Sequence, residues 1–560
     1  MKILRGAALL LCFLPLSFGE SKLLGILSQE LDRNFSILKE KADPPPYFLS
    51  YEVTEEESQH IGATLGALTS DSGSTSRYLD VSLRAGEPKL DNYHRVRGER
   101  AHFTSGARVS IDDDPRAIQQ QVWIETDRAY RAAAERLIKI RSNEKMRVAA
   151  DDPSDDFSVE RPSVHSEPPP AFQINKDKWT DRVRRLSNAF QGYSDILISG
   201  VTFTAQRETK YFVSTEGSRL EHGRSFVRIS ISAEGRAEDG MNLSTFESFD
   251  AADPSALPTD SLLQDAVLRV AKDLTALLRA PVVDPYLGPA IFSGRAAGVF
   301  FHEIFGHRIE GHRQKDESEG QTFTKSLGKS VLPDFLSVVF DPTLHKFDGT
   351  DLNGWYSYDD EGIVGQKFTA VDHGMLKAFL MSRSPIQGFE HSNGHGRRQP
   401  GLEPVSRQSN LLVESTKTVS DARLREMLIA EIKRQNKPYG LYFKEVTGGF
   451  TTTARAGMQA FKVLPVLVYR VYPDGKPDEL VRGVDIVGTP LASFAKILAT
   501  SDHAEIFNGY CGAESGTVPV SAVSPAILVS EIEIEKKEKS QDKPPLLPFP
   551  KDAGHLVSVP

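Results

Sequence analysis

The segment FFHEIFGHRIEGH, from Phe300 to His312, combines histidines and carboxylates of the kinds that bind metal ions. In the H-E-x-x-H motif, two histidines four residues apart share one helical face and bind zinc, and the glutamate beside them is the general base. Here Gly306 stands where the second histidine is expected, and His307 follows one position later. The residue types therefore indicate hydrolytic metal chemistry, but the spacing does not fit a regular helix.

On a regular helix, His302 and His307 point roughly 140° apart, so one ion cannot contact both imidazoles. Gly306 lies between them and could accommodate a wider turn or a break in the backbone. We therefore expect the helix to be irregular across Ile304 to Gly306. The plain alternative is two hydrogen-bonded histidines that merely share a helix.

A catalytic zinc site usually has three protein ligands and an open position for water, so two histidines leave the site one ligand short. Cys511 is a candidate third ligand, because a thiolate with two imidazoles suits zinc better than magnesium or calcium. Glu310 and His312 are alternatives close by in the sequence. Cys511 as a small buried residue without a ligand role is the remaining possibility.

The elements that must position these residues can be read from the sequence. Ser293 is a good N-cap for a buried helix that carries His302. With 560 residues the chain is expected to form two domains, 20–281 and 282–535. Hydrophobic periodicity predicts helices over 21–42, 116–140, 179–190 and 262–280, and strands over 47–58, 76–86, 195–206, 225–236, 335–342, 464–473 and 480–488. The fold class is therefore α/β (α+β), with a mixed N-terminal domain and a strand-rich C-terminal one.

Two segments lack any such period. The acidic, proline-rich stretch at 149–172 is expected to be an exposed loop rather than part of a core. The tail at 536–560 is rich in lysine and proline and is expected to be flexible.

Composition and the N-terminus limit the possible partners and compartments. A formal charge of -9 with both signs interspersed gives no basic surface for nucleic acid. Residues 1–19 have a basic start, an apolar run too short to span a membrane, and small residues before a cleavage point after Gly19, which predicts a signal peptide. No later stretch predicts a transmembrane anchor. We expect a protein exported to the periplasm or secreted, although a buried N-terminal helix is the alternative. Removal of Cys12 with the signal peptide would leave Cys511 as a lone thiol.

Several stretches in order give a more specific indication. AAGVFFHEIFGHRIEG, YDDEGIVGQKFTAVDHGMLKAFLMSR, GRRQPGLEPVSRQSN, VTGGF and YCGAESGTVPVS make the chain resemble the TldD/PmbA family, once called modulators of DNA gyrase, over about 284–529. Members like the TldD branch are metallopeptidases with H-E-x-x-x-H and a distant cysteine. The resemblance implies Zn²⁺ on His302, His307 and Cys511, with Glu303 catalytic. It also implies dimers that enclose the active sites, formed with a second copy or a related chain.

The resulting hypothesis is a zinc metallopeptidase that hydrolyses short or unfolded polypeptides. A zinc-stabilised peptide-binding or pseudo-enzyme subunit that acts with a partner chain is the alternative, and retention of Glu303 argues against it. Arg397, Arg398 and His312 are guesses for an oxyanion-stabilising residue, with ordinary surface roles favoured for all three. The signal peptide, the proline-rich segment and the tail depart from the family's familiar cytoplasmic members, so compartment and physiological substrate do not follow from the resemblance.

Overall fold

The computed structural model describes residues 21–95, 106–144, 152–456, 461–488 and 493–537. The predicted signal peptide and nearly all of the predicted tail lie outside these ranges. The first half contains α1 (Lys22–Lys41), β1 (Pro46–Thr64), β2 (Ala67–Glu87), β3 (Leu90–Asp91), β4 (Ala107–Arg108), α2 (Pro115–Glu144), β5 (Val164–Ser166), α3 (Lys176–Asn188), η1 (Ala189–Gly192), β6 (Ile198–Ser214), β7 (Arg219–Arg236), β8 (Asn242–Ala251), η2 (Pro254–Ala256) and α4 (Asp260–Arg279).

The second half contains β9 (Tyr286–Phe292), α5 (Gly294–Ile304), η3 (Gly306–Ile309), α6 (His312–Lys315), β10 (Leu336–Phe340), β11 (Lys346–Phe347), β12 (Thr350–Asp351), β13 (Phe368–Asp372), β14 (Met375–Leu376), β15 (Gly396–Arg397), β16 (Val405–Ser406), β17 (Asn410–Ser415), β18 (Thr418–Val419), α7 (Asp421–Arg434), β19 (Gly440–Thr451), β20 (Phe461–Val471), β21 (Glu479–Val481), β22 (Val484–Gly488), β23 (Ile497–Ala513) and β24 (Gly516–Lys536). Each predicted helix and strand has a counterpart among these elements.

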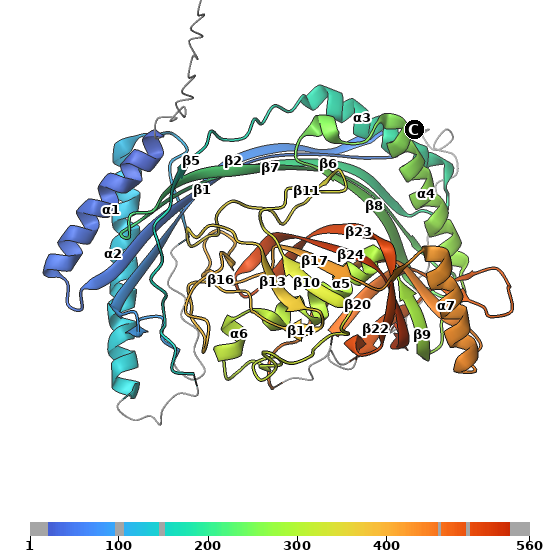
Figure 1. The fold of residues 1–560 in the computed structure, drawn as a ribbon. Helices are drawn as coiled ribbons and strands as arrows, with labels where there is room; N and C mark the ends of the chain where they lie inside the picture. Colours follow the sequence, from blue (N-terminus) through green and yellow to red (C-terminus); the bar gives the residue numbers. More distant parts are fainter. Residues whose placement is uncertain (1–20, 96–105, 145–151, 457–460, 489–492, 538–560) are drawn as a thin grey trace, which may run out of the picture.

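The first sheet arches over the second half of the chain (Figure 1). Within the described residues it has eight strands in the order β3-β2-β1-β6-β7-β5, with β4 paired to β2 and β8 to β7. Apolar side chains of α1 and α2 pack with one part of this sheet, and those of α3 and α4 pack with another. The concave face of the sheet is left to face the second half of the molecule.

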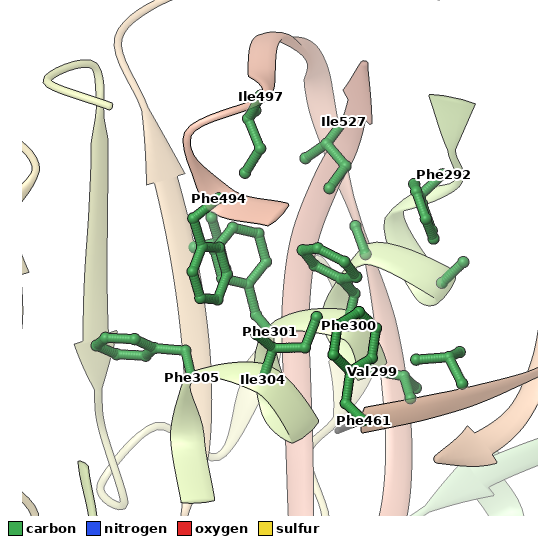
Figure 2. Close-up of a cluster of buried hydrophobic side chains, with 14 of the residues drawn as sticks. Phe292, Val299, Phe300, Phe301, Ile304, Phe305, Phe461, Phe494, Ile497 and Ile527 are labelled. Atoms are coloured by element: carbon green, nitrogen blue, oxygen red, sulfur yellow. The ribbon is translucent and has the colours of Figure 1, made fainter. Parts of the chain in front are cut away.

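The second sheet curls around α5. In the described part of the chain it has twelve strands, and β9, β19, β20, β22 and β24 form a closed circuit because β24 also pairs with β9. All residues of α5 except Arg295 are buried. Phe300, Phe301 and Phe305 pack with Phe461 and Phe494 in one apolar cluster (Figure 2). A helix buried on every side is held rigidly, as a metal site requires.

The predicted fold class is confirmed by the two sheets with their covering helices. The exact domain boundary at 281/282 stays a prediction. In the described residues, no helix combines the length and the apolar character needed to cross a membrane.

The expectation of an exposed loop at 149–172 is wrong for its central part. Phe157 is 3% exposed, and its ring lies 3.7 Å from the Arg84 guanidinium and 3.9 Å from that of Arg383. Further along, β5 adds a parallel strand to β7. Polar and proline-rich residues can be buried when the segment packed against them supplies hydrogen bonds. Here the backbone amide of Ser158 donates to the backbone carbonyl of Arg383 at 2.9 Å.

Candidate metal centre

The helix that carries the first histidine begins where the sequence predicts. Ser293 has extended backbone angles, and its Oγ accepts a hydrogen bond from the Ala296 amide at 3.1 Å. This side chain satisfies one of the amides left free at a helix start. Ser293 is therefore confirmed as the N-cap of α5.

The predicted irregularity between the histidines is confirmed and is a break rather than a wide turn. Helix α5 ends at Ile304, Phe305 forms a turn, and a 3₁₀ segment, η3, starts at Gly306. Arg308 closes the broken end, because its guanidinium donates to the carbonyl of Glu303 at 3.0 Å and to that of Ile304 at 3.3 Å. A cation at this position also complements the negative end of the helix dipole.

Gly306 is required for a different reason from the one expected. A Cβ there would lie 1.9 Å from Oε1 of Gln408. The Gln408 amide occupies that space and donates to the backbone carbonyl of His302 at 3.2 Å. In a regular helix that carbonyl would accept from the amide of Gly306. Gln408 thus replaces the hydrogen bond that the break removes.

The break brings both histidines to Cys511. Nε2 of His302 lies 3.2 Å from Sγ of Cys511, and Nε2 of His307 lies 3.3 Å from the same sulfur. The three possible ligand atoms all lie within 4.8 Å of one another, and all three residues are buried. Zinc bonds of about 2.3 Å to sulfur and 2.0–2.1 Å to nitrogen fit a cluster of this size. The structure therefore brings the three predicted ligands together, and their ligand role stays a prediction.

The two alternative ligands have other partners. Glu310 lies 3.2 Å from Nδ1 of His307, the ring nitrogen that faces away from the cluster, and its other oxygen accepts from Arg313 at 2.7 Å. His312 is bonded through Nε2 to Glu514 at 2.5 Å. Among the described residues, the compact group of potential ligand atoms consists of His302, His307 and Cys511. Neither Glu310 nor His312 belongs to it.

Electrostatics favour the charged forms of the buried groups in this cluster. Burial lowers the pKa of His307, but the charges of Cys511 and Glu310 outweigh it and raise that pKa well above its usual range. Burial raises the pKa of Cys511, but His307 and His302 outweigh it and hold the pKa well below its usual range. Burial also raises the pKa of Glu310, and His307 and Arg313 again outweigh it and lower the pKa. Cys511 and Glu310 are thus anionic, and a thiolate is the form of cysteine that binds metal ions.

Glu303 lies beside this cluster in a cavity of about 580 Å³ that His302, His307 and Cys511 also line. The cavity lies between the second sheet and strands β7 and β8 of the first. Gly449 makes room for Glu303, because a Cβ there would lie 2.6 Å from Cγ of the glutamate. Burial raises the pKa of Glu303. A buried carboxylate at an open cavity beside three potential ligands can accept and return a proton.

The guesses for an oxyanion-stabilising residue are not supported by geometry. Arg397, Arg398 and His312 do not line this cavity, and the favoured surface roles are also wrong because each is at most 5% exposed. Arg398 pairs with Glu52 of the first sheet at 3.2 Å. An ion pair between residues so far apart in the chain cannot be predicted from the residues next to either partner.

Sequence reasoning missed two residues that support the cluster. Besides Gln408, the fully buried Arg407 donates to the carbonyl of Cys511 at 2.5 Å and so fixes the strand that carries the thiol. Both lie in the stretch GRRQPGLEPVSRQSN, which contributes to the family resemblance but gives neither residue a role. Two adjacent long polar residues just before a strand are the single signal that the sequence offers.

The sequence of this chain is similar to those of known metalloproteases. Residues 286–536 match the family model described as the PmbA/TldA metallopeptidase C-terminal domain. A metalloprotease of Archaeoglobus fulgidus is 26% identical over 358 residues, which are 62% of this chain and 76% of the relative. A zinc metalloprotease TldD homolog of Saccharolobus solfataricus is 27% identical over 249 residues, which are 44% of this chain and about half (51%) of the relative.

The fold is shared with a solved structure, TldE from Thermococcus kodakarensis. The similarity has a TM-score of 0.62 and 14% identity, and it covers 91% of this chain and all of the other. At this identity the likeness extends to the fold alone. The family model over residues 286–536 and the curated relatives, which are named metalloproteases and TldD homologs, support the placement of this chain in the TldD/PmbA family.

Proposed function

We propose that this protein is an exported zinc metallopeptidase that hydrolyses peptide bonds in short or unfolded polypeptides. The observation that carries the proposal is the convergence of His302, His307 and Cys511 on one point of a cavity that Glu303 also lines. Two imidazoles and a thiolate suit zinc, and three protein ligands leave one position open for water or substrate.

The residues around the three proposed ligands are also suited to a zinc site. Glu310 fixes the orientation of the His307 ring through Nδ1, which directs Nε2 at the cluster. When bound, zinc would polarise the scissile carbonyl and lower the pKa of a water molecule. Glu303 would accept a proton from the attacking water as the new C–O bond forms, and would then deliver that proton to the amine nitrogen as the C–N bond breaks.

The substrate is proposed to enter in extended form. Residues 447–451 of β19 line the cavity, and in the described structure only β20 pairs with this part of the strand. An extended peptide could pair its backbone with the other edge, as peptides do when they add a strand to a sheet. We further propose a dimer, either of two copies or with a related chain, that restricts access to flexible segments.

A peptide-binding subunit without its own activity is the alternative, acting with a partner chain. The buried carboxylate of Glu303 beside the cluster favours the enzyme, because a site that only binds or stabilises needs no proton acceptor.

The mature protein is expected to contain one zinc ion per chain and to cleave a destabilised domain while it spares a stable variant of that domain. Metal analysis, sizing and gel-based cleavage assays measure this, with chelator treatment as the control. Zinc without cleavage of any unfolded protein would favour the binding subunit. Equal cleavage of both domains by a monomer would contradict the proposed enclosure.

Glu310→Gln is expected to weaken zinc binding by about 10- to 100-fold, because residues that orient a metal ligand typically contribute that much. The amide would keep the shape but lose the charge that pairs with His307 and Arg313. Competition with a chromophoric chelator measures the affinity. Glu319→Gln is the matched control, because it removes a carboxylate that pairs with the same Arg313, at 2.9 Å. Equal affinity in the two variants would contradict the orienting role.

A further inference from the structure

A second cavity of about 320 Å³ adjoins the one that contains the metal cluster. Tyr510 lines both cavities, and its side chain is 48% exposed although it stands between two halves of the molecule. Strand β7 also runs past both. Arg224 lines the second cavity and Arg228 the first, and residues separated by an even number along a strand face the same side. Four residues of extended chain span about 13 Å, so an extended peptide of about that length reaches from one cavity to the other.

Most charges in the second cavity already have partners. Lys210 forms an ion pair with Asp360, and Arg398 pairs with Glu52 at 3.2 Å and lies 3.8 Å from Asp80. These contacts join the first sheet to the second domain. They account for two of the basic side chains that line this cavity, those of Lys210 and Arg398.

Two arginines of this cavity have only neutral oxygens as hydrogen-bond partners within the described residues. Arg224 donates to the backbone carbonyl and the side-chain oxygen of Asn353, at 2.9 and 2.6 Å. Arg397 donates to the backbone carbonyls of Gln408 and Pro519, at 2.6 and 2.8 Å. Burial lowers the pKa of Arg224 more than the nearby Glu208 raises it, and the charge of Arg397 adds to the lowering. The two guanidiniums thus line one cavity, and their like charges repel each other.

Three further acids line this cavity, namely Glu56, Glu208 and Asp359, and Asp359 accepts its hydrogen bonds from backbone amides. Glu208 lies 3.8 Å from Lys210, with which it shares a strand. Burial and the charge of Glu208 raise the pKa of Glu56. Beside them, His222 is 7% exposed, and burial lowers its pKa to about 3, so the ring is a neutral hydrogen-bonding group. A bound anion would relieve the repulsion between the two arginines.

We propose that this second cavity binds a carboxylate of the peptide substrate through Arg224 and Arg397, about four residues from the metal cluster along an extended chain. The inference rests on the proposed peptidase function, because it assigns the far end of that enzyme's substrate. Arginine is the side chain best suited to such recognition, since its guanidinium can form two parallel hydrogen bonds to a carboxylate. The carboxylate has two possible sources, the C-terminus of a peptide or an acidic side chain.

Binding of fluorescein-labelled hexapeptides to the metal-free, full-length mature protein tests this without cleavage. Three peptides of one sequence are compared by fluorescence anisotropy: one with a free C-terminus, one with a C-terminal amide, and the amide with a glutamate near its end. The free acid is expected to bind about tenfold more tightly than the amide, as for a hydrogen bond between charged groups. Recovery of that affinity by the glutamate peptide would identify an acidic side chain as a sufficient source.

Arg224→Gln is expected to weaken binding of the carboxylate peptides by about tenfold and to leave the amide unchanged. Arg224→Lys, which keeps the charge, should retain part of the preference. Arg236→Gln is the matched control, because Arg236 ends the same strand and donates to Asn242 instead. If Arg224→Gln does not fold, the comparison of peptides with the wild-type protein and the lysine variant decides the question.

Equal binding of all three peptides by the wild-type protein, or no binding of any, would overturn the carboxylate site. Failure of the proposed function is a separate result. A protein that prefers carboxylate peptides but cleaves none when loaded with zinc would lose its assignment as a peptidase and keep this site.

Discussion

Cys511→Ser is expected to lose bound zinc, because it removes one of the three proposed protein ligands and the only thiol among the described residues. A serine hydroxyl is a poor substitute, since it stays protonated where the thiol of Cys511 ionises readily. The affinity should fall by more than about 100-fold, beyond the loss typical for a residue that only orients a ligand. Peptide cleavage should fall with it. His307→Ala should also lose bound zinc and activity, because Nε2 of the native His307 lies 3.3 Å from the same sulfur.

Zinc content after dialysis and competition with a chelator measure the expected loss, and circular dichroism checks that each variant folds. His312→Gln is the matched control for a buried histidine, because His312 bonds to Glu514 and lies outside the compact cluster. Full zinc occupancy in Cys511→Ser would refute the ligand role of the thiol. Loss of zinc in His312→Gln alone would move the site toward the alternative ligands.

Glu303→Gln is expected to keep zinc and the fold and to lower kcat by about 10²- to 10⁴-fold, the usual contribution of a positioned general base. The amide has the same shape, so it fits against Gly449, but it cannot accept a proton from water. Steady-state cleavage of an unfolded substrate gives kcat, and metal analysis gives zinc content for the same preparation.

A matched comparison is Glu319→Gln, a carboxylate that lines the same cavity but pairs with Arg313. It should retain most of the activity if position beside the metal cluster, rather than charge in the cavity, is what matters. Normal turnover by Glu303→Gln would end its assignment as general base and would require another proton acceptor.

The sequence alone determined the local features of the site. Ser293 predicted the start of α5 because a hydroxyl before an apolar helix can satisfy a free amide. The five-residue spacing of His302 and His307 required an irregular backbone, and α5 indeed ends between them. Hydrophobic periodicity likewise predicted the long strands of the first sheet and the helices that cover it. These properties depend on residues a few positions apart, so a linear pattern contains them.

Only the tertiary structure shows which of the possible third ligands lies beside both histidines. Cys511 is 204 residues from His307, and it reaches the cluster because β23 pairs with β24 inside the sheet that surrounds α5. Glu310, nearer in sequence, is instead directed to the outer nitrogen of His307. Gln408, Phe157 and Arg224 also acquire their contacts from segments distant in the chain. Hydrogen bonds and buried charges depend on which surfaces meet in space, and the order of residues in a single chain does not specify those meetings.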